Sequence, residues 1–119
     1  MQEITGKVII HNGERKVPSD YRPDPDQPIF YEVIRVMKGH FLFLQDHLER
    51  MQFSLDQSGH TYPEIHALKD DLLLLLQEEH AKTGNVKLVI QPKAPVFPRW
   101  SFFIPHSYPE PEAYRNGVC

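Results

Sequence analysis

The sequence predicts an α+β fold, in which two helices pack on one face of a mostly antiparallel sheet. Strand-like runs rich in Ile, Val, Phe and Tyr come first and last, and two helix-like runs lie between them. A tight-turn signal at Asn12-Gly13 adds a hairpin near the start. The chain has 119 residues, of which 40% are hydrophobic, so we expect a single domain, 1–119, with its own core.

The first elements are expected to be a hairpin and a loop. Asn12-Gly13 predicts a strand at 7–11 that returns antiparallel at 14–17, since a two-residue turn needs residues that tolerate positive φ. Residues 18–28 hold four prolines and three aspartates. Each proline removes a backbone donor and disfavours helix in the residue before it, so this segment is expected to be a loop.

A second hairpin is expected around Lys38-Gly39. Residues 29–37 are rich in Ile, Val, Phe and Tyr, which favour a strand. Gly39 tolerates the positive φ of a tight turn, so residues 40–44 are expected to pair back onto this strand.

The first helix is expected to begin at Asp46, which is a good N-cap residue. Glu49 lies three residues later and could reach back to complete a capping box. Gly59 is expected to end the helix. Its buried stripe has helical spacing and comprises Leu48, Met51 and Leu55.

The second helix is expected to begin near Pro63 and to stop at Gly84. Leu73 and Leu74 widen its apolar face, so we expect this helix to be covered on more than one side. The core of that face comprises Ile65, Leu68, Leu72, Leu75 and Leu76.

The last elements are two strands separated by a proline-rich loop. Residues 85–91 alternate, so that Lys87, Val89 and Gln91 share one face of a strand. Residues 92–99 form the loop and 100–104 the last short strand, with Trp100 in the core. Residues 105–116 are polar and lack periodicity. We expect the sequence to be a truncation of a longer protein.

Bulk composition narrows the classes of function. The formal charge of -3 and the pI near 6.1 give no electrostatic reason to expect nucleic acid as a partner. The lone Cys119 cannot form an internal disulfide, and the start lacks the basic and apolar regions of a signal peptide. The longest apolar run is too short for a bilayer. We therefore expect a soluble, cytoplasmic protein without a membrane partner.

No metal or nucleophile motif stands out. The seven histidines show no metal-ligand spacing, so no metal site is expected. The chain contains no nucleophile elbow, no phosphate loop and no paired-cysteine motif.

Arg50 is the first candidate for a binding role. If Asp46 is the cap, Arg50 lies one turn into the helix, where a phosphate would meet free backbone amides and the guanidinium together. The alternative is an exposed arginine that pairs with Asp46 or Glu49, and spacing alone favours this alternative. His47 is expected to hydrogen-bond and fix the start of the helix.

Tyr31 and Arg35 are the next candidates, because they share one face of their strand on either side of Val33. Such a pair could line a carboxylate-binding pocket for a substrate. The alternative, which is the more common case, is a half-exposed sheet surface. Glu32 lies on the opposite face.

These residues also carry a resemblance to a known family. Phe30-Tyr31-Glu32, a glycine turn, and then His47-Leu48-Glu49-Arg50-Met51 with Ser54 resemble the N-terminal domain of the class IV pyridoxal-phosphate aminotransferases. That family includes branched-chain aminotransferases, D-amino-acid aminotransferases and aminodeoxychorismate lyases. The early hairpin and the strand at 85–91 fall in the corresponding order, so the resemblance covers most of the chain.

The resemblance implies a role for each matching residue. Arg50 matches the arginine that binds the phosphate of pyridoxal 5'-phosphate, and Tyr31 matches an aromatic position beside the substrate. Glu32 and His47 match positions that support the site structurally. For the substrate carboxylate, this sequence offers only Lys93 and, several residues later, Arg99 where the family carries arginines.

The departures from the family limit the expectation. Family members usually carry glycines just before the first long strand, and residues 26–29 contain none. The lysine that forms the Schiff base lies in the second domain of the family, and the lysines of this chain do not occupy its place. We therefore expect the isolated chain to be inactive.

The resemblance implies that the complete protein is a cytoplasmic homodimer that transfers an amino group between an amino acid and a 2-oxo acid. Two alternatives remain open. One is an aminodeoxychorismate lyase of the same family. The other is a non-catalytic binding or interaction module with this fold, which the missing glycines favour.

Overall fold

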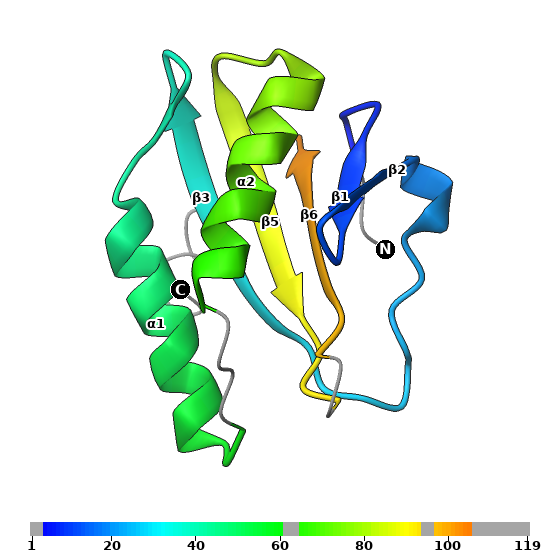
Figure 1. Ribbon diagram of the computed structural model, residues 1–119, viewed down its shortest axis with the longest axis vertical. Coiled ribbons are helices and arrows are strands. Elements are labelled where there is room, and N and C mark those ends of the chain that lie inside the picture. Colours follow the sequence, from blue (N-terminus) through cyan, green and yellow to red (C-terminus); the bar gives the residue numbers. More distant parts are fainter. Residues whose placement is uncertain (1–3, 61–64, 94–96, 106–119) are drawn as a thin grey trace.

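A six-stranded antiparallel sheet carries two helices on one face, which confirms the predicted α+β class (Figure 1). The computed structural model describes residues 4–60, 65–93 and 97–105. The strand order is β2-β1-β6-β5-β3-β4. The elements are β1 (Ile9–His11), β2 (Glu14–Lys16), a short 3-10 helix η1 (Pro18–Asp20), β3 (Phe30–Met37), β4 (His40–Phe41), α1 (Leu44–Gln57), α2 (Ile65–Glu79), β5 (Gly84–Ile90) and β6 (Arg99–Ile104).

Both predicted hairpins are confirmed. Asn12 and Gly13 have φ of 51° and 85°, and Lys38 and Gly39 have φ of 52° and 78°. Two consecutive positive φ values are the geometry that matches the twist of an antiparallel pair. The return strand β4 is shorter than expected and pairs only with Val36 and Met37.

Strand β3 sits between β5 and β4 and separates two sets of side chains. Ile34 and Val36 point into the core beneath the helices, so Glu32 lies on that face as well. Tyr31 and Val33 contribute to a cluster on the opposite face. The predicted alternation along this strand is therefore confirmed.

Helix α1 starts earlier than expected, so the predicted strand at 40–44 is shortened to 40–41 and the predicted Asp46 cap is wrong. Phe43 occupies the N-cap position with φ of 55° and makes no side-chain capping bond. The chain has to turn sharply from β4 into the helix, and the left-handed conformation of Phe43 makes that turn. Asp46 remains in the first helical turn, where its negative charge interacts favourably with the positive end of the helix dipole.

The end of α1 is as predicted. Gly59 has φ of 84° and donates its N–H to the carbonyl of Asp56 at 3.0 Å. His60 donates to the carbonyl of Leu55 at 2.8 Å. These two bonds form a Schellman motif, which closes the helix with glycine in the left-handed position.

Helix α2 ends at Glu79, so the predicted stop at Gly84 is wrong. His80 takes a positive φ of 59° and ends the helix, and Gly84 opens β5 instead. Its predicted start near Pro63 lies outside the described residues. Leu73 is 47% exposed, so the expectation that it extends the buried face is also wrong.

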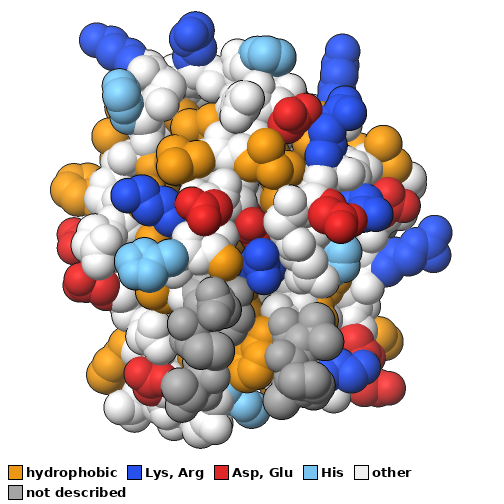
Figure 2. Space-filling model, viewed as in Figure 1, with side chains coloured by type: hydrophobic (Ala, Val, Ile, Leu, Met, Phe, Trp, Pro, Cys, Tyr) orange, Lys and Arg blue, Asp and Glu red, His pale blue; other side chains and the backbone are white. Residues whose placement is uncertain are grey.

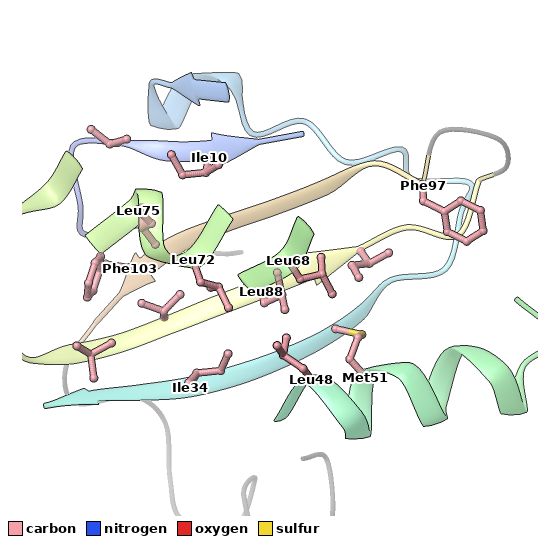
Figure 3. Close-up of a cluster of buried hydrophobic side chains, with 14 of the residues drawn as sticks. Ile10, Ile34, Leu48, Met51, Leu68, Leu72, Leu75, Leu88, Phe97 and Phe103 are labelled. Atoms are coloured by element: carbon pink, nitrogen blue, oxygen red, sulfur yellow. The ribbon is translucent and has the colours of Figure 1, made fainter. Parts of the chain in front are cut away.

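The main core lies between the helices and the sheet. Figure 3 shows Leu48 and Met51 of α1 and Leu72 of α2 pointing toward Ile34 and Leu88 of the sheet. A smaller cluster on the other face comprises Ile9, Val33, Val89, Trp100, Phe102 and Ile104. No helix among the described residues has the length and apolar character that crossing a bilayer requires.

We predict that Leu72→Ala lowers the free energy of unfolding by about 2–5 kcal/mol, because the fully buried side chain leaves a cavity between helix and sheet. Its neighbour provides a matched control: Leu73→Ala removes the same atoms from the exposed side of α2 and should cost less than about 0.5 kcal/mol. Urea unfolding followed by circular dichroism measures both. Equal losses would contradict this placement of α2.

Candidate functional site

A buried carboxylate on β3 brings together two side chains of α1. Glu32 is 4% exposed, and its Oε1 accepts a hydrogen bond from His47 Nδ1 at 2.6 Å. Arg50 Nε–H donates to both carboxylate oxygens of Glu32, at 3.2 and 3.3 Å. A buried charge requires such partners, so Glu32, His47 and Arg50 form one unit that fastens α1 to β3.

The spacing of α1 places both partners on the same flank of the helix. His47 and Arg50 are three residues apart, so they lie one above the other. Leu48 and Met51 point into the core and fix the rotation of the helix. Because His47 Nδ1 donates to Glu32, the contact of 3.2 Å between this nitrogen and Arg50 Nη2 joins two donors and is a close approach only.

Arg50 lies deeper in the helix than the sequence indicated. The helix begins at Leu44, so Arg50 is six residues past the first and about 9 Å along the axis. The premise that Asp46 is the cap and that Arg50 lies one turn into the helix is therefore wrong. The alternative pairing with Asp46 or Glu49 is not seen either, because Arg50 pairs with Glu32.

The guanidinium of Arg50 remains able to bind an anion. Its side chain is 44% exposed. Nε–H is directed to Glu32, and the two Nη groups carry the remaining donors. The arrangement is thus a half-exposed cation whose orientation is fixed from below by a buried carboxylate.

Tyr31 and Arg35 lie on the other face of the sheet, as predicted. Arg35 Nη1 donates to the side-chain oxygen of Asn85 on β5 at 3.3 Å. Lys87 Nζ lies 4.5 Å from the centroid of the Tyr31 ring. Lys87 is not among the site residues that the sequence predicts. The alternation of β5 puts it on one face with Val89 and Gln91, and the register of β5 with β3 brings that face to Tyr31.

Arg99 lies on the helix face of the sheet, away from Tyr31 and Arg35. It donates through Nε to Asp71 Oδ2 at 2.5 Å and through Nη2 to Oδ1 at 3.4 Å. Both side chains are largely buried. Burial raises the pKa of the Asp71 carboxyl above its usual value, and the Arg99 guanidinium offsets part of that rise. The sequence does contain a sign of this pair, because Asp71 stands within the leucine-rich stripe of α2, where a buried acid needs a partner.

Lys93 lies in the loop after β5, where its Nζ is 3.4 Å from Asp24 Oδ2. The four predicted substrate residues therefore lie in three separate parts of the structure. Tyr31 and Arg35 share the helix-free face of the sheet, Arg99 lies on the helix face, and Lys93 lies in the loop after β5. The three residues Glu32, His47 and Arg50, in contrast, form a single cluster.

Gln91 is a further buried polar residue that the sequence did not single out. Its amide nitrogen donates to the carbonyls of Asp24 at 2.7 Å and of Gln27 at 3.4 Å. Its amide oxygen accepts the N–H of Asp24 at 2.8 Å. The side chain thus ties the proline-rich loop to the end of β5.

Two hollows elsewhere are lined by other residues. One of about 230 Å³ lies between α1 and α2, and one of about 410 Å³ lies near the end of β6. Figure 2 shows acidic and basic side chains interspersed over the helix-bearing face. Within residues 4–60, 65–93 and 97–105, no group of three or more His, Cys, Asp or Glu side chains could hold a metal ion.

The buried Asp71 carboxyl predicts a pH dependence of stability. Its pKa is raised above the ordinary 3.8, so the folded protein holds this proton more tightly than the unfolded chain does. The stability that this group contributes is full below pH 3.8 and is lost as the pH rises through the raised pKa.

We compare the free energy of unfolding of the wild type with that of Asp71→Asn. The wild-type value minus the variant value is expected to fall as the pH rises from 3.8 through the raised pKa of Asp71. Asparagine does not titrate and keeps the shape of the side chain. Urea titrations at a series of pH values measure the difference. A difference that grows with pH would mean that the pairing with Arg99 outweighs burial.

Comparison with known proteins identifies the fold. No protein-family model matches the chain, and no curated protein does. Among solved structures, the branched-chain amino acid aminotransferase from Escherichia coli matches with a TM-score of 0.72 and 15% sequence identity, over 85% of this chain and 41% of the enzyme.

Two further structures agree. The branched-chain amino acid aminotransferase from Thermobaculum terrenum, solved as a mutant, has a TM-score of 0.68 and 11% identity over 84% of this chain and 38% of that enzyme. A hypothetical aminotransferase from Mycobacterium tuberculosis in its PLP-bound form has a TM-score of 0.69 and 16% sequence identity, over 82% of this chain and 39% of that protein. The chain thus spans about two fifths of the length of these enzymes. It has the fold of the small N-terminal domain of class IV aminotransferases.

Proposed function

We propose that this chain is the N-terminal domain of a pyridoxal-phosphate-dependent class IV aminotransferase, in which Arg50 binds the phosphate of the cofactor. The cluster of Glu32, His47 and Arg50 carries the proposal, because it holds a cation in a fixed orientation at the position that the family resemblance implies. The likeness of the fold to solved aminotransferases supports it.

The donors of Arg50 fit a phosphate. A guanidinium whose Nε–H is engaged still presents the N–H groups of its Nη atoms, and these match the spacing of phosphate oxygens. Glu32 and His47 hold the side chain in place before the ligand arrives, so less conformational freedom is lost on binding. When bound, pyridoxal phosphate supplies an electron sink for reactions at the carbon that bears the amino group.

The rest of the activity would require further polypeptide. Since the chain spans 41% of the Escherichia coli enzyme, a second domain would supply the Schiff-base lysine and the remaining site residues. The substrates would be an amino acid and a 2-oxo acid, and the protein would act as a cytoplasmic homodimer. Tyr31 and Arg35 are proposed to face the substrate. Lys93 and Arg99 are weaker candidates, because each is paired with an aspartate.

The two alternatives separate by experiment. An aminodeoxychorismate lyase would use the same Arg50, so only assays of the complete protein on both reactions distinguish it from a transaminase. A non-catalytic module is favoured by the absence of glycines at 26–29. Such a module would have no preference for the phosphorylated form of the cofactor.

We expect Arg50→Ala to weaken binding of pyridoxamine 5'-phosphate by about tenfold, because a half-exposed charge-assisted contact contributes near 1.5 kcal/mol. NMR titration of the protein measures the affinity, and the amine form of the ligand avoids side reactions with lysines. Arg15→Ala removes an exposed arginine that pairs with Glu78 and serves as the control. Equal affinities for wild type and Arg50→Ala would refute the proposal.

We further expect Glu32→Gln to reduce the preference for pyridoxamine 5'-phosphate over unphosphorylated pyridoxamine several-fold, since the guanidinium loses its charged anchor. The ratio of the two affinities isolates the phosphate contact from general loss of structure. Glu32→Asp, which keeps the charge, should restore part of the ratio. If the ratio stays at the wild-type value in Glu32→Gln, Glu32 does not position Arg50.

A further inference from the structure

The Asn12-Gly13 turn combines an exposed position with a reactive dipeptide. Both residues are exposed at the end of the β1–β2 hairpin. The side-chain amide of an asparagine can be attacked by the backbone nitrogen of the next residue, and glycine hinders this attack least because it has no Cβ atom. The product, aspartate or isoaspartate, carries a negative charge that asparagine lacks. The residues that make the tight turn are therefore also a candidate site of covalent modification.

The folded turn holds the two reacting atoms apart. Asn12 has a φ of 51°, and a non-glycine residue with such a φ takes a ψ of about +30 to +60°. At this ψ the Gly13 nitrogen lies nearly trans to the Asn12 Cβ atom across the Cα–C bond, so it points away from the side-chain amide. The main chain has to rotate before the nitrogen can reach the amide carbon.

Hydrogen bonds to strand β6 hold the same residue in place. The Asn12 N–H donates to the carbonyl of Arg99 at 3.1 Å, and Asn12 Oδ1 accepts the backbone N–H of Arg99 at 3.0 Å. Strand β1 ends at His11, which lies opposite Trp100. The Asn12 amide oxygen thus takes the place of a backbone carbonyl and extends the β1–β6 ladder beyond the strand. Rotation of Asn12 requires both bonds to break.

His11 fastens this end of the ladder. Its ring stacks on that of Trp100, with centroids 4.7 Å apart and 12° between the planes, and its Nδ1 donates to the carbonyl of Arg99 at 3.0 Å. Beyond His11 the hairpin is weakly held, because β2 is a three-residue edge strand whose Glu14 and Arg15 are exposed. Short, exposed elements open locally at a lower cost in free energy than the whole fold.

We propose that Asn12 deamidates spontaneously, and that it reacts only when the end of the β1–β6 ladder opens. The Gly13 backbone nitrogen attacks the side-chain carbonyl carbon of Asn12 and forms a C–N bond. The bond from that carbon to the amide nitrogen breaks, and this nitrogen leaves as ammonia with the proton from the Gly13 N–H. Water then adds to either carbonyl of the resulting succinimide and opens the ring to aspartate or isoaspartate. The proposal does not depend on phosphate binding by Arg50.

The two products differ in their effect on the hairpin. Aspartate keeps an oxygen that can accept the Arg99 N–H. Isoaspartate adds one carbon to the main chain between residues 12 and 13, so a two-residue turn no longer fits the pairing of His11 with Glu14. Either product adds a negative charge next to the buried pair of Asp71 and Arg99, since a Cβ atom built on Gly13 would lie 3.5 Å from Arg99 Nη2 and 3.8 Å from Asp71 Oδ1.

Peptide mass spectrometry of the full chain tests the proposal. Wild-type protein is incubated at mildly alkaline pH in native buffer and in concentrated urea, and the aspartate and isoaspartate formed at position 12 are measured over time. Asn116-Gly117 repeats the dipeptide and provides the reference for the intrinsic rate in urea. We expect Asn12 to react several-fold more slowly in native buffer than in urea, because only the open fraction of the hairpin reacts. Equal rates in the two solutions, or no product in native buffer after the reaction in urea is complete, would overturn the proposal.

A pair of variants tests which contacts protect Asn12. His11→Ala removes the stack on Trp100 and the bond to the Arg99 carbonyl, so the rate at Asn12 in native buffer should rise several-fold. His60→Ala is the matched control, because it removes a ring that contacts Phe30 near the end of α1, and it should leave the rate unchanged. Rates in urea correct for any effect of the side chain at position 11 on the reaction itself. Equal acceleration by both variants would mean that the reaction follows global unfolding, and no acceleration by either would mean that the ladder end does not control it; each result contradicts the proposal.

Discussion

The interaction on which the arrangement depends is the burial of the Glu32 carboxylate between β3 and α1. A carboxylate with 4% exposure is unfavourable without partners, so His47 and Arg50 must lie where they do for the helix to dock. The same bonds that satisfy the buried charge also orient the guanidinium outward. Stability and the proposed binding role are therefore consequences of one contact.

Much of the architecture could be predicted because its signals are local. Asn12, Gly13 and Gly39 determine the two turns through positive φ, which glycine and asparagine adopt more readily than other residues. The apolar stripe of α1 and the glycine that ends it are read from spacing within one helix. These features need no knowledge of what the helix packs against.

The errors arose where a distant contact or an unusual conformation decides the outcome. Phe43 begins α1 in a left-handed conformation that propensity disfavours for an aromatic residue, and the local sequence therefore favours Asp46 as the cap. The pairing of Arg99 could not be predicted from the sequence, because its partner Asp71 is 28 residues away along the chain. Tyr31 and Arg35 were placed on the correct face, because strand alternation is fixed by backbone geometry. The roles of Tyr31, Arg35, Arg50, Lys93 and Arg99 in binding stay predictions.

The three hydrogen bonds of Gln91 have a mechanical consequence for the segment that enters β3. They join the backbone at Asp24 and Gln27 to the end of β5, so this segment can separate from the sheet only when all three break together. The stretch of loop just before β3 is therefore held against the end of β5.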